Sequence, residues 1–172
     1  GLTTLPIGNY EAKQKLSLIE RFKPKVLYGS TTYFMHLAAL AETDVKESSI
    51  EVMLTGLEGG SIPYIERLEE VWGAKAFDRF GSAQMRSDHM FTCERGFGTV
   101  DEPGVLHNID PYAILEVLSL ESGQQVSNGE YGEIIITSLY HQDVPLIRCQ
   151  MRDGGIFRSG HSCSCGREMD GL

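Results

Sequence analysis

The chain has 172 residues, 41% of them hydrophobic, which is enough apolar material for one domain or two small domains with packed cores. Its formal net charge of -9 argues against sequence-independent binding to nucleic acid, which needs many basic side chains on one face. No apolar run is long enough to span a membrane, and residues 1–10 lack the basic-then-apolar order of a signal peptide, so we expect a cytoplasmic protein.

The first half of the sequence alternates helical and strand patterns. Helices are expected at residues 9–22, 31–41 and 61–73, and short buried strands at residues 26–28, 50–54 and 75–80. This alternation predicts a parallel sheet with flanking helices. Ligands bind at the carboxyl ends of such strands, and three loops that contain glycine fall there, at residues 28–30, 55–61 and 80–85. The alternative is that these glycines simply end the strands.

The second half is rich in strand and turn signals. Residues 112–120 and 133–139 are β-rich runs, and two turn signals, Ser122-Gly123 and Asn128-Gly129, lie between them. Further short strands are expected at residues 146–149 and 156–157. The pattern predicts a small antiparallel β subdomain, a sheet or partial barrel. The predicted fold class is therefore α/β, with an α/β subdomain at residues 1–88 and a β-rich subdomain at residues 89–172.

The chain has four cysteines, Cys93, Cys149, Cys163 and Cys165. A chain of this length with a hydrophobic core does not need disulfides for stability. A disulfide between Cys163 and Cys165 would be strained, because one residue separates them, so a metal-binding pair or free thiols are expected. Cys149 lies within an apolar strand pattern and is expected in the core.

Several segments occur in an order that is typical of one enzyme family. They are Phe80–Gln84, Glu121–Gly123, Gly129–Ile134, Pro145–Asp153 and Cys163–Arg167. The ordered set resembles the phenylacetate–coenzyme A ligase branch of the adenylate-forming enzymes, and the resemblance covers nearly the whole chain. It implies an acid–thiol ligase that forms AMP and uses ATP, Mg²⁺, coenzyme A and a carboxylic acid of the aryl kind.

The resemblance also implies a two-step reaction. The carboxylate attacks the α-phosphate of ATP and gives an acyl-adenylate and pyrophosphate. The thiol of coenzyme A then displaces AMP and gives a thioester. Asp153 matches the family aspartate that accepts hydrogen bonds from both ribose hydroxyls, a role that suits an acceptor-only carboxylate. The alternative for Asp153 is a solvated turn residue before Gly154.

Three loops match the family's substrate-binding loops. The adenine-side loop corresponds to Glu58, Gly59 and Gly60, and the loop along the nucleotide to Phe80, Gly81, Ser82, Ala83 and Gln84. The acyl pocket corresponds to Tyr28, Gly29 and Gly81. No residue of the chain is assigned as catalytic.

The nucleotide loop departs from the family pattern at its end. The family has a hydroxyl residue that bonds the phosphate and then a glutamate that helps to hold Mg²⁺, but this chain has Ala83 and Gln84. A neutral amide is a poorer ligand for a hard cation than a carboxylate. Ser82 could supply the hydroxyl if the match shifts by one residue. These departures put the rate and the activity in question.

The resemblance places further parts of the enzyme outside the chain. A phosphate loop rich in glycine, serine and threonine should precede residue 1, and a small domain with the catalytic lysine should follow Leu172. We therefore expect a fragment that is inactive without these N- and C-terminal parts.

The resemblance finally implies a structural zinc site. Some family members bind zinc through two cysteines on a loop and through a cysteine and a histidine upstream, which correspond to Cys163, Cys165, Cys93 and His107. Thiolates and an imidazole suit tetrahedral Zn²⁺, and four protein ligands leave no open position for chemistry. His161 and His89 are rivals for the fourth ligand.

Two other functions remain open. The protein could adenylate an acid and pass the acyl group to an acceptor other than coenzyme A. It could also be a zinc-stapled binding module without catalysis, as Ala83 and Gln84 suggest. The identity of the acid and the formation of a homodimer are not determined by the sequence.

Overall fold

The computed structural model describes residues 3–140, 143–160 and 162–172. The chain divides into two compact units, Gly1–Ala76 and Phe77–Leu172. Among the helices of the described residues, none has the combination of length and apolar character that a membrane span requires.

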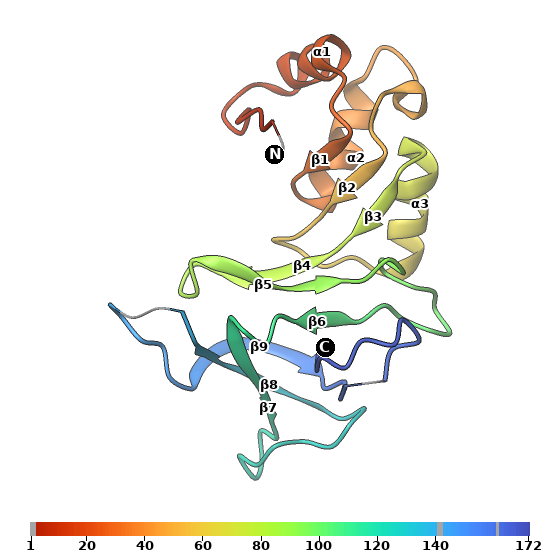
Figure 1. Cartoon of the computed structure of the whole chain (residues 1–172). Helices are drawn as coiled ribbons and strands as arrows, with labels where there is room; N and C mark the ends of the chain where they lie inside the picture. Colours follow the sequence, from red (N-terminus) through yellow and green to blue (C-terminus); the bar gives the residue numbers. More distant parts are fainter. Residues whose placement is uncertain (1–2, 141–142, 161) are drawn as a thin grey trace. The chain divides into compact units, whose positions relative to one another are not determined.

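The first unit consists of a small sheet and its helices (Figure 1). Its elements are α1 (Ala12–Phe22), β1 (Val26–Tyr28), α2 (Thr31–Leu40), the short 3₁₀ helix η1 (Val45–Glu47), β2 (Val52–Leu54), α3 (Ile62–Trp72) and β3 (Lys75–Phe77). The strand order is β1-β2-β3, and β1 runs parallel to β2. The predicted parallel sheet with helices is confirmed.

Local signals explain where the helices begin and end. Helix α1 begins at Ala12 rather than near Asn9, because Glu11 and Gln14 form a capping box at its start. Helix α3 ends at Gly73, which has a left-handed φ of 62°. The fully buried Trp72 fastens α3 to α2, since its Nε1 donates a hydrogen bond to the Phe34 carbonyl at 3.2 Å.

The second unit consists of two antiparallel sheets (Figure 1). Its strands are β4 (Arg79–Ser82), β5 (Ser87–Thr92), β6 (Leu106–Asn108), β7 (Ala113–Leu118), β8 (Tyr131–Ser138) and β9 (Cys149–Ile156). The sheets have the orders β4-β5-β6 and β7-β8-β9, and an apolar core that includes Met90, Val117 and Ile136 lies within the unit. The predicted α/β class with an antiparallel β part is confirmed.

The last residues of the chain connect the two antiparallel sheets. Leu172 and Leu106 of β6 exchange two backbone hydrogen bonds of 3.0 and 3.1 Å. Gly171 exchanges two more with Arg158, which follows β9, at 2.9 and 2.8 Å. Figure 1 shows the C-terminus beside β6 and β9. We call residues 170–172 the joining strand.

One predicted strand is in fact two strands. The run at residues 75–80 is interrupted at Asp78, whose backbone N–H donates to Thr92 Oγ1 at 2.9 Å and whose carbonyl accepts from the Thr92 N–H at 3.0 Å. The buried Arg79 side chain pairs with Asp88 of β5. The expectation that residues 80–85 form a loop after a parallel strand is therefore wrong for residues 80–82, which pair with β5, whereas residues 83–85 lie in a turn.

Two further differences follow from strand pairing. The two units divide at Ala76, earlier than the boundary expected after residue 88, because β4 pairs within the second unit. The strand expected at residues 146–149 is wrong, since β9 begins only at Cys149 and continues to Ile156. The apolar and polar residues alternate only over residues 149–152, and the rest of the strand is Asp153, two glycines and Ile156.

Candidate nucleotide loops and metal centre

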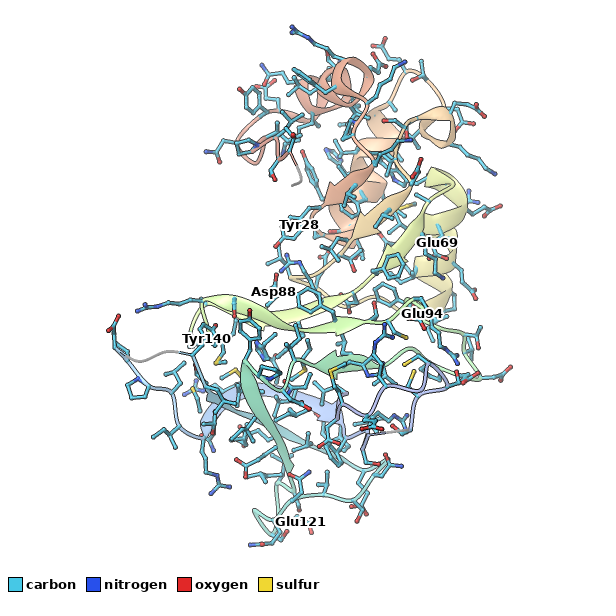
Figure 2. The ribbon with its side chains drawn as sticks, viewed as in Figure 1. Tyr28, Glu69, Asp88, Glu94, Glu121 and Tyr140 are labelled. Atoms are coloured by element: carbon cyan, nitrogen blue, oxygen red, sulfur yellow. The ribbon has the colours of Figure 1, made fainter. Side chains whose placement is uncertain are left out.

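A tight turn at residues 82–87 connects β4 to β5 and contains the end of the predicted nucleotide loop. The Met85 N–H donates to Ser82 Oγ at 3.2 Å, so the hydroxyl oxygen of Ser82 supports the turn. The Tyr140 hydroxyl contacts both the Met85 carbonyl and the Ser87 hydroxyl (Figure 2). Met85 itself is fully buried. The turn is therefore anchored from inside by one tyrosine.

The exposed side chains of this turn do not fit a divalent cation. Ala83 and Gln84 are not carboxylates. The closest carboxylate in the sequence, Asp88, is paired with Arg79. Oxygen ligands with negative charge are what Mg²⁺ requires from a protein. We therefore derive no reaction step through a metal ion held by this turn.

Gly81, predicted to lie near both the nucleotide and the acid, has a structural requirement of its own. A Cβ at Gly81 would lie 2.5 Å from the Ser87 carbonyl oxygen and 2.5 Å from Asp88 Oδ1. The close approach of β5 therefore demands glycine here, whether or not a ligand binds. Phe80, the other strand residue of the predicted loop, packs edge-on against His89 at a centroid distance of 5.7 Å.

In the first unit, the structure brings together the two predicted loops that follow β1 and β2. The Gly29 N–H donates to the Leu54 carbonyl at 3.2 Å. Glu58 accepts hydrogen bonds from the Thr32 N–H at 2.7 Å and the Thr32 hydroxyl at 2.6 Å, and these bonds lower the pKa of Glu58 to about 2. The Glu58 carboxylate thus binds the first turn of α2 instead of standing free for adenine.

The remaining residues of these two loops differ in their accessibility. The Tyr28 side chain is 60% exposed, and a Cβ at Gly59 would meet no atom within 4 Å. Gly29 and Gly60 lie against side chains, because a Cβ on either would come within 2.9 Å of Phe34 or Ile65. Tyr28 and Gly59 therefore offer open surface to a ligand.

Asp153 lies in a bulge of β9. Glu133 pairs with Gly154 and Ile135 pairs with Gln150, so Ile134 alone lies opposite Met151–Asp153. Arg152 has a left-handed φ of 62°. A side chain at Gly154 would collide with the Tyr131 hydroxyl.

The bulge takes Asp153 out of the ladder of paired residues. Its side chain is exposed, and within the described part of the chain no hydrogen bond or ion pair of its carboxylate is found. Bulges of this kind re-aim side chains near functional sites. Both carboxylate oxygens are thus available to a pair of hydroxyl donors, as the predicted ribose contact requires.

Four potential metal ligands meet in the second unit. Cys93 follows β5, His107 lies on β6, and Cys163 and Cys165 lie on the segment before the joining strand. Their ligand atoms all lie within 4.8 Å of one another. Three of the four, Cys93, His107 and Cys163, are buried.

The distances within this group fit a tetrahedral zinc site. Zn–S bonds of about 2.3 Å and Zn–N bonds of about 2.0 Å place ligands about 3.8 Å (S to S) and about 3.5 Å (S to N) apart. The Cys93 and Cys163 sulfurs are 3.9 Å apart, and the Cys165 sulfur is 3.4 Å from His107 Nε2. Three thiolates and an imidazole are also a ligand type that zinc prefers.

One rival for the fourth ligand, His89, does not join this group. His89 is fully buried on β5, where its ring packs edge-on against Phe80. It is not among the four clustered ligands. His161 lies outside the described residues. The geometry thus selects His107 over His89.

The electrostatics of the group favour a bound cation. Burial raises the pKa of the Cys163 thiol to about 11, because the thiolate is poorly solvated there. Burial also lowers the pKa of His107, against an opposing interaction with the Met169 backbone, and so keeps the imidazole in the neutral form that binds metal. A divalent ion would supply the positive charge that buried thiolates need.

Two arginines flank the four ligands. Arg95 contacts Ser164 and Glu102, and its pKa is raised mainly by Glu102 and also by the charges of Cys163 and Cys93. Arg167 donates to Glu94 at 2.7 Å (Figure 2) and also interacts with Cys165. Zn²⁺ with three thiolates would carry one surplus negative charge, and both guanidinium groups would lie close to it.

Sequence reasoning missed these arginines, the tyrosine anchor and the bulge. A signal for the arginines exists, since Arg95 and Arg167 each follow a candidate ligand, Cys93 or Cys165, by two residues. The contacts of Tyr140 with residues 85 and 87 have no such local signal.

Comparison with known proteins places the fold. No family model matches the chain. The chain is 23% identical to the phenylacetate-coenzyme A ligase of Thermus thermophilus over 170 residues, which are 97% of this chain and 37% of that protein. It is 23% identical to the enzyme of the same name from Escherichia coli over 158 residues, 89% of this chain and 35% of that protein. The predicted resemblance to phenylacetate–coenzyme A ligases is confirmed.

A solved structure agrees with these sequence relatives. A 2-hydroxyisobutyryl-CoA ligase in complex with its acyl-adenylate has a TM-score of 0.84 and 22% identity over 96% of this chain and 34% of that one. At this identity the likeness shows the fold. The chain spans about a third of the length of the curated relatives it matches.

Proposed function

We propose that the protein activates a carboxylic acid with ATP and transfers the acyl group to coenzyme A. The observation that carries this proposal is the similarity to phenylacetate-coenzyme A ligases over 89% to 97% of the chain. The exposed carboxylate of Asp153, presented by the bulge of β9, adds support from the site itself.

In the first step, a carboxylate oxygen of the acid attacks the α-phosphorus of ATP, and the bond to pyrophosphate breaks. In the second step, the sulfur of coenzyme A attacks the acyl carbon, the bond to AMP breaks, and the thiol proton passes to solvent. In this proposal Asp153 accepts hydrogen bonds from the ribose hydroxyls in both steps. The turn at residues 82–87 lies along the nucleotide, and Tyr140 holds its backbone in place.

For the first unit, we propose contacts with adenine and with the acid. We assign adenine contact to the backbone of Gly59 and Gly60, because Gly59 faces open space. Glu58 supports them indirectly by fixing the loop to α2. Tyr28 offers an exposed aromatic ring, which favours an aryl acid, as in the phenylacetate enzymes.

In this proposal the metal centre has a structural role only. Cys93, His107, Cys163 and Cys165 would hold Zn²⁺ with no position left for substrate. The ion would crosslink the loop after β5 and β6 to the C-terminal segment. The flanking Arg95 and Arg167 would lie near the negative charge of the thiolates, and the neutral imidazole of His107 would be ready to bind the ion.

Acid-dependent exchange of pyrophosphate into ATP tests the first step, and thioester formation with coenzyme A tests the second step. Both assays use the whole protein and a panel of aryl acids and small branched acids. We expect both reactions with at least one aryl acid. Exchange without thioester would instead indicate another acyl acceptor.

A second function has one specific observation in its favour. Ala83 and Gln84 replace a hydroxyl and a carboxylate, which is compatible with a binding module that has lost catalysis. The same exchange assay distinguishes the two. No exchange with any acid, in a folded protein that holds its metal, would contradict the ligase proposal and favour the module.

A further inference from the structure

The joining strand starts shortly after the last metal ligand and touches both antiparallel sheets. On one side Leu172 pairs with Leu106, and the Asn108 N–H donates to the Asp170 carbonyl at 2.8 Å. On the other side Gly171 pairs with Arg158. The metal centre and the joining strand together therefore form the connection between β6 and the end of β9.

The joining strand ends against the strand that carries Asp153. A Cβ on Gly155 would lie 2.8 Å from Leu172 Cδ2, so the Leu172 side chain rests directly on the β9 backbone two residues after Asp153. Leu172 also packs with the core of the unit. If Leu172 moved, Gly155 would lose this packing contact. Gly155 belongs to the part of β9 that pairs with β8 again after the bulge.

Burial contributes little to the segment between the cysteines and the joining strand, which polar contacts hold. Between Cys163 and Gly171 no residue is fully buried. The Asp170 carboxylate accepts a hydrogen bond from the Gly160 N–H at 2.8 Å, and Arg167 is held by Glu94 at the surface. Such a segment has small packing energy of its own, so its order depends on its two ends.

We propose that the metal centre positions Asp153 through the joining strand, with Leu172 as the positioning residue that transmits the constraint to the β9 bulge. The metal fixes Cys163 and Cys165 against β5 and β6. The joining strand then carries Leu172 to a defined place under Gly155. This inference rests on the proposed function only for the statement that Asp153 binds ribose.

Amide hydrogen exchange of the 172-residue chain tests the connection without reference to activity. Three samples are compared: the metal-loaded chain, the chain after chelation, and Leu172→Ala with its metal retained. Leu120→Ala is the matched control, since Leu120 is 73% exposed in the same unit. The amides of β2 in the first unit serve as internal reference.

Chelation and Leu172→Ala should each accelerate exchange at residues 152–155 by about tenfold or more, while Leu120→Ala and the β2 amides stay unchanged. Unchanged exchange at residues 152–155 after verified loss of metal would overturn the proposal. Absence of metal from the purified chain by elemental analysis would overturn it as well.

A second readout links the connection to nucleotide binding. In the whole protein, Leu172→Ala should raise KM for ATP several-fold but leave KM for 2′,3′-dideoxy-ATP, which lacks the ribose hydroxyls, nearly unchanged. An equal rise for both nucleotides would show general loosening and would contradict positioning of Asp153. If the ligase proposal fails, the whole protein will show no turnover, but the expected changes in amide hydrogen exchange at residues 152–155 will still be observed.

Discussion

Removal of the metal from Cys93, His107, Cys163 and Cys165 is expected to lower the thermal stability of the chain. The apolar cluster around this site is small, with only Cys93, Val105 and Cys163 buried in it among the described residues. Packing therefore does little to hold the C-terminal segment, and metal binding acts as folding free energy. A ligand present at about a hundred times its dissociation constant stabilises the folded state by about 2.7 kcal/mol.

For a chain of 172 residues this stabilisation corresponds to a fall in Tm of about 5–11 °C on metal removal, at about 2–4 °C per kcal/mol. Scanning calorimetry with and without a strong chelator measures it, with metal content determined by elemental analysis. Cys163→Ser should reproduce the fall in Tm without chelator. Cys149→Ser is the control, because Cys149 is outside the cluster. A zinc-free chain, or a zinc-loaded chain with an unshifted Tm, would refute the reasoning.

Three further outcomes are expected. Asp153→Ala should lower kcat/KM for ATP about ten- to a hundredfold through loss of charge-assisted hydrogen bonds worth about 1.5–3 kcal/mol; unchanged steady-state ATP kinetics would make Asp153 a surface residue. Tyr140→Phe should reduce stability by about 1–2 kcal/mol in urea unfolding and speed amide exchange in the turn at residues 82–87, and unchanged exchange would show that the turn holds itself. Glu58, with a pKa lowered to about 2 by its bonds to Thr32, should stabilise the fold above its unfolded pKa of about 4.3, and this contribution should be lost as pH falls toward 2. In Glu58→Gln that part of the acid sensitivity should disappear from the unfolding curves, and an identical pH profile would count against the hydrogen-bonded carboxylate.

Local sequence patterns were sufficient for the first unit. Hydrophobic periodicity and breakers such as Pro24 and Gly73 predict α2, α3 and the strands β1 and β2 to within a few residues, because these signals act on neighbours along the chain. The spacing of Cys163 and Cys165 by itself indicates a metal-binding pair or free thiols, because a disulfide across one residue would be strained. The turn signals between residues 120 and 130 correctly separate β7 from β8.

Contacts between distant residues decided the rest. Residues 79–82 form a strand of the second unit only because β4 pairs with β5, and the ion pair between the side chains of Arg79 and Asp88 supports this pairing. Asp153 lies in a bulge only because of the register between β8 and β9. The resemblance assigns Glu58 to the adenine-side loop, and only the structure shows that its carboxylate accepts a hydrogen bond from Thr32, which is distant in the sequence. Cys93 and His107 become partners of Cys163 and Cys165 because β5 and β6 pair and the joining strand returns to them. Such contacts depend on which segments meet in space, and no window of neighbouring residues contains that information.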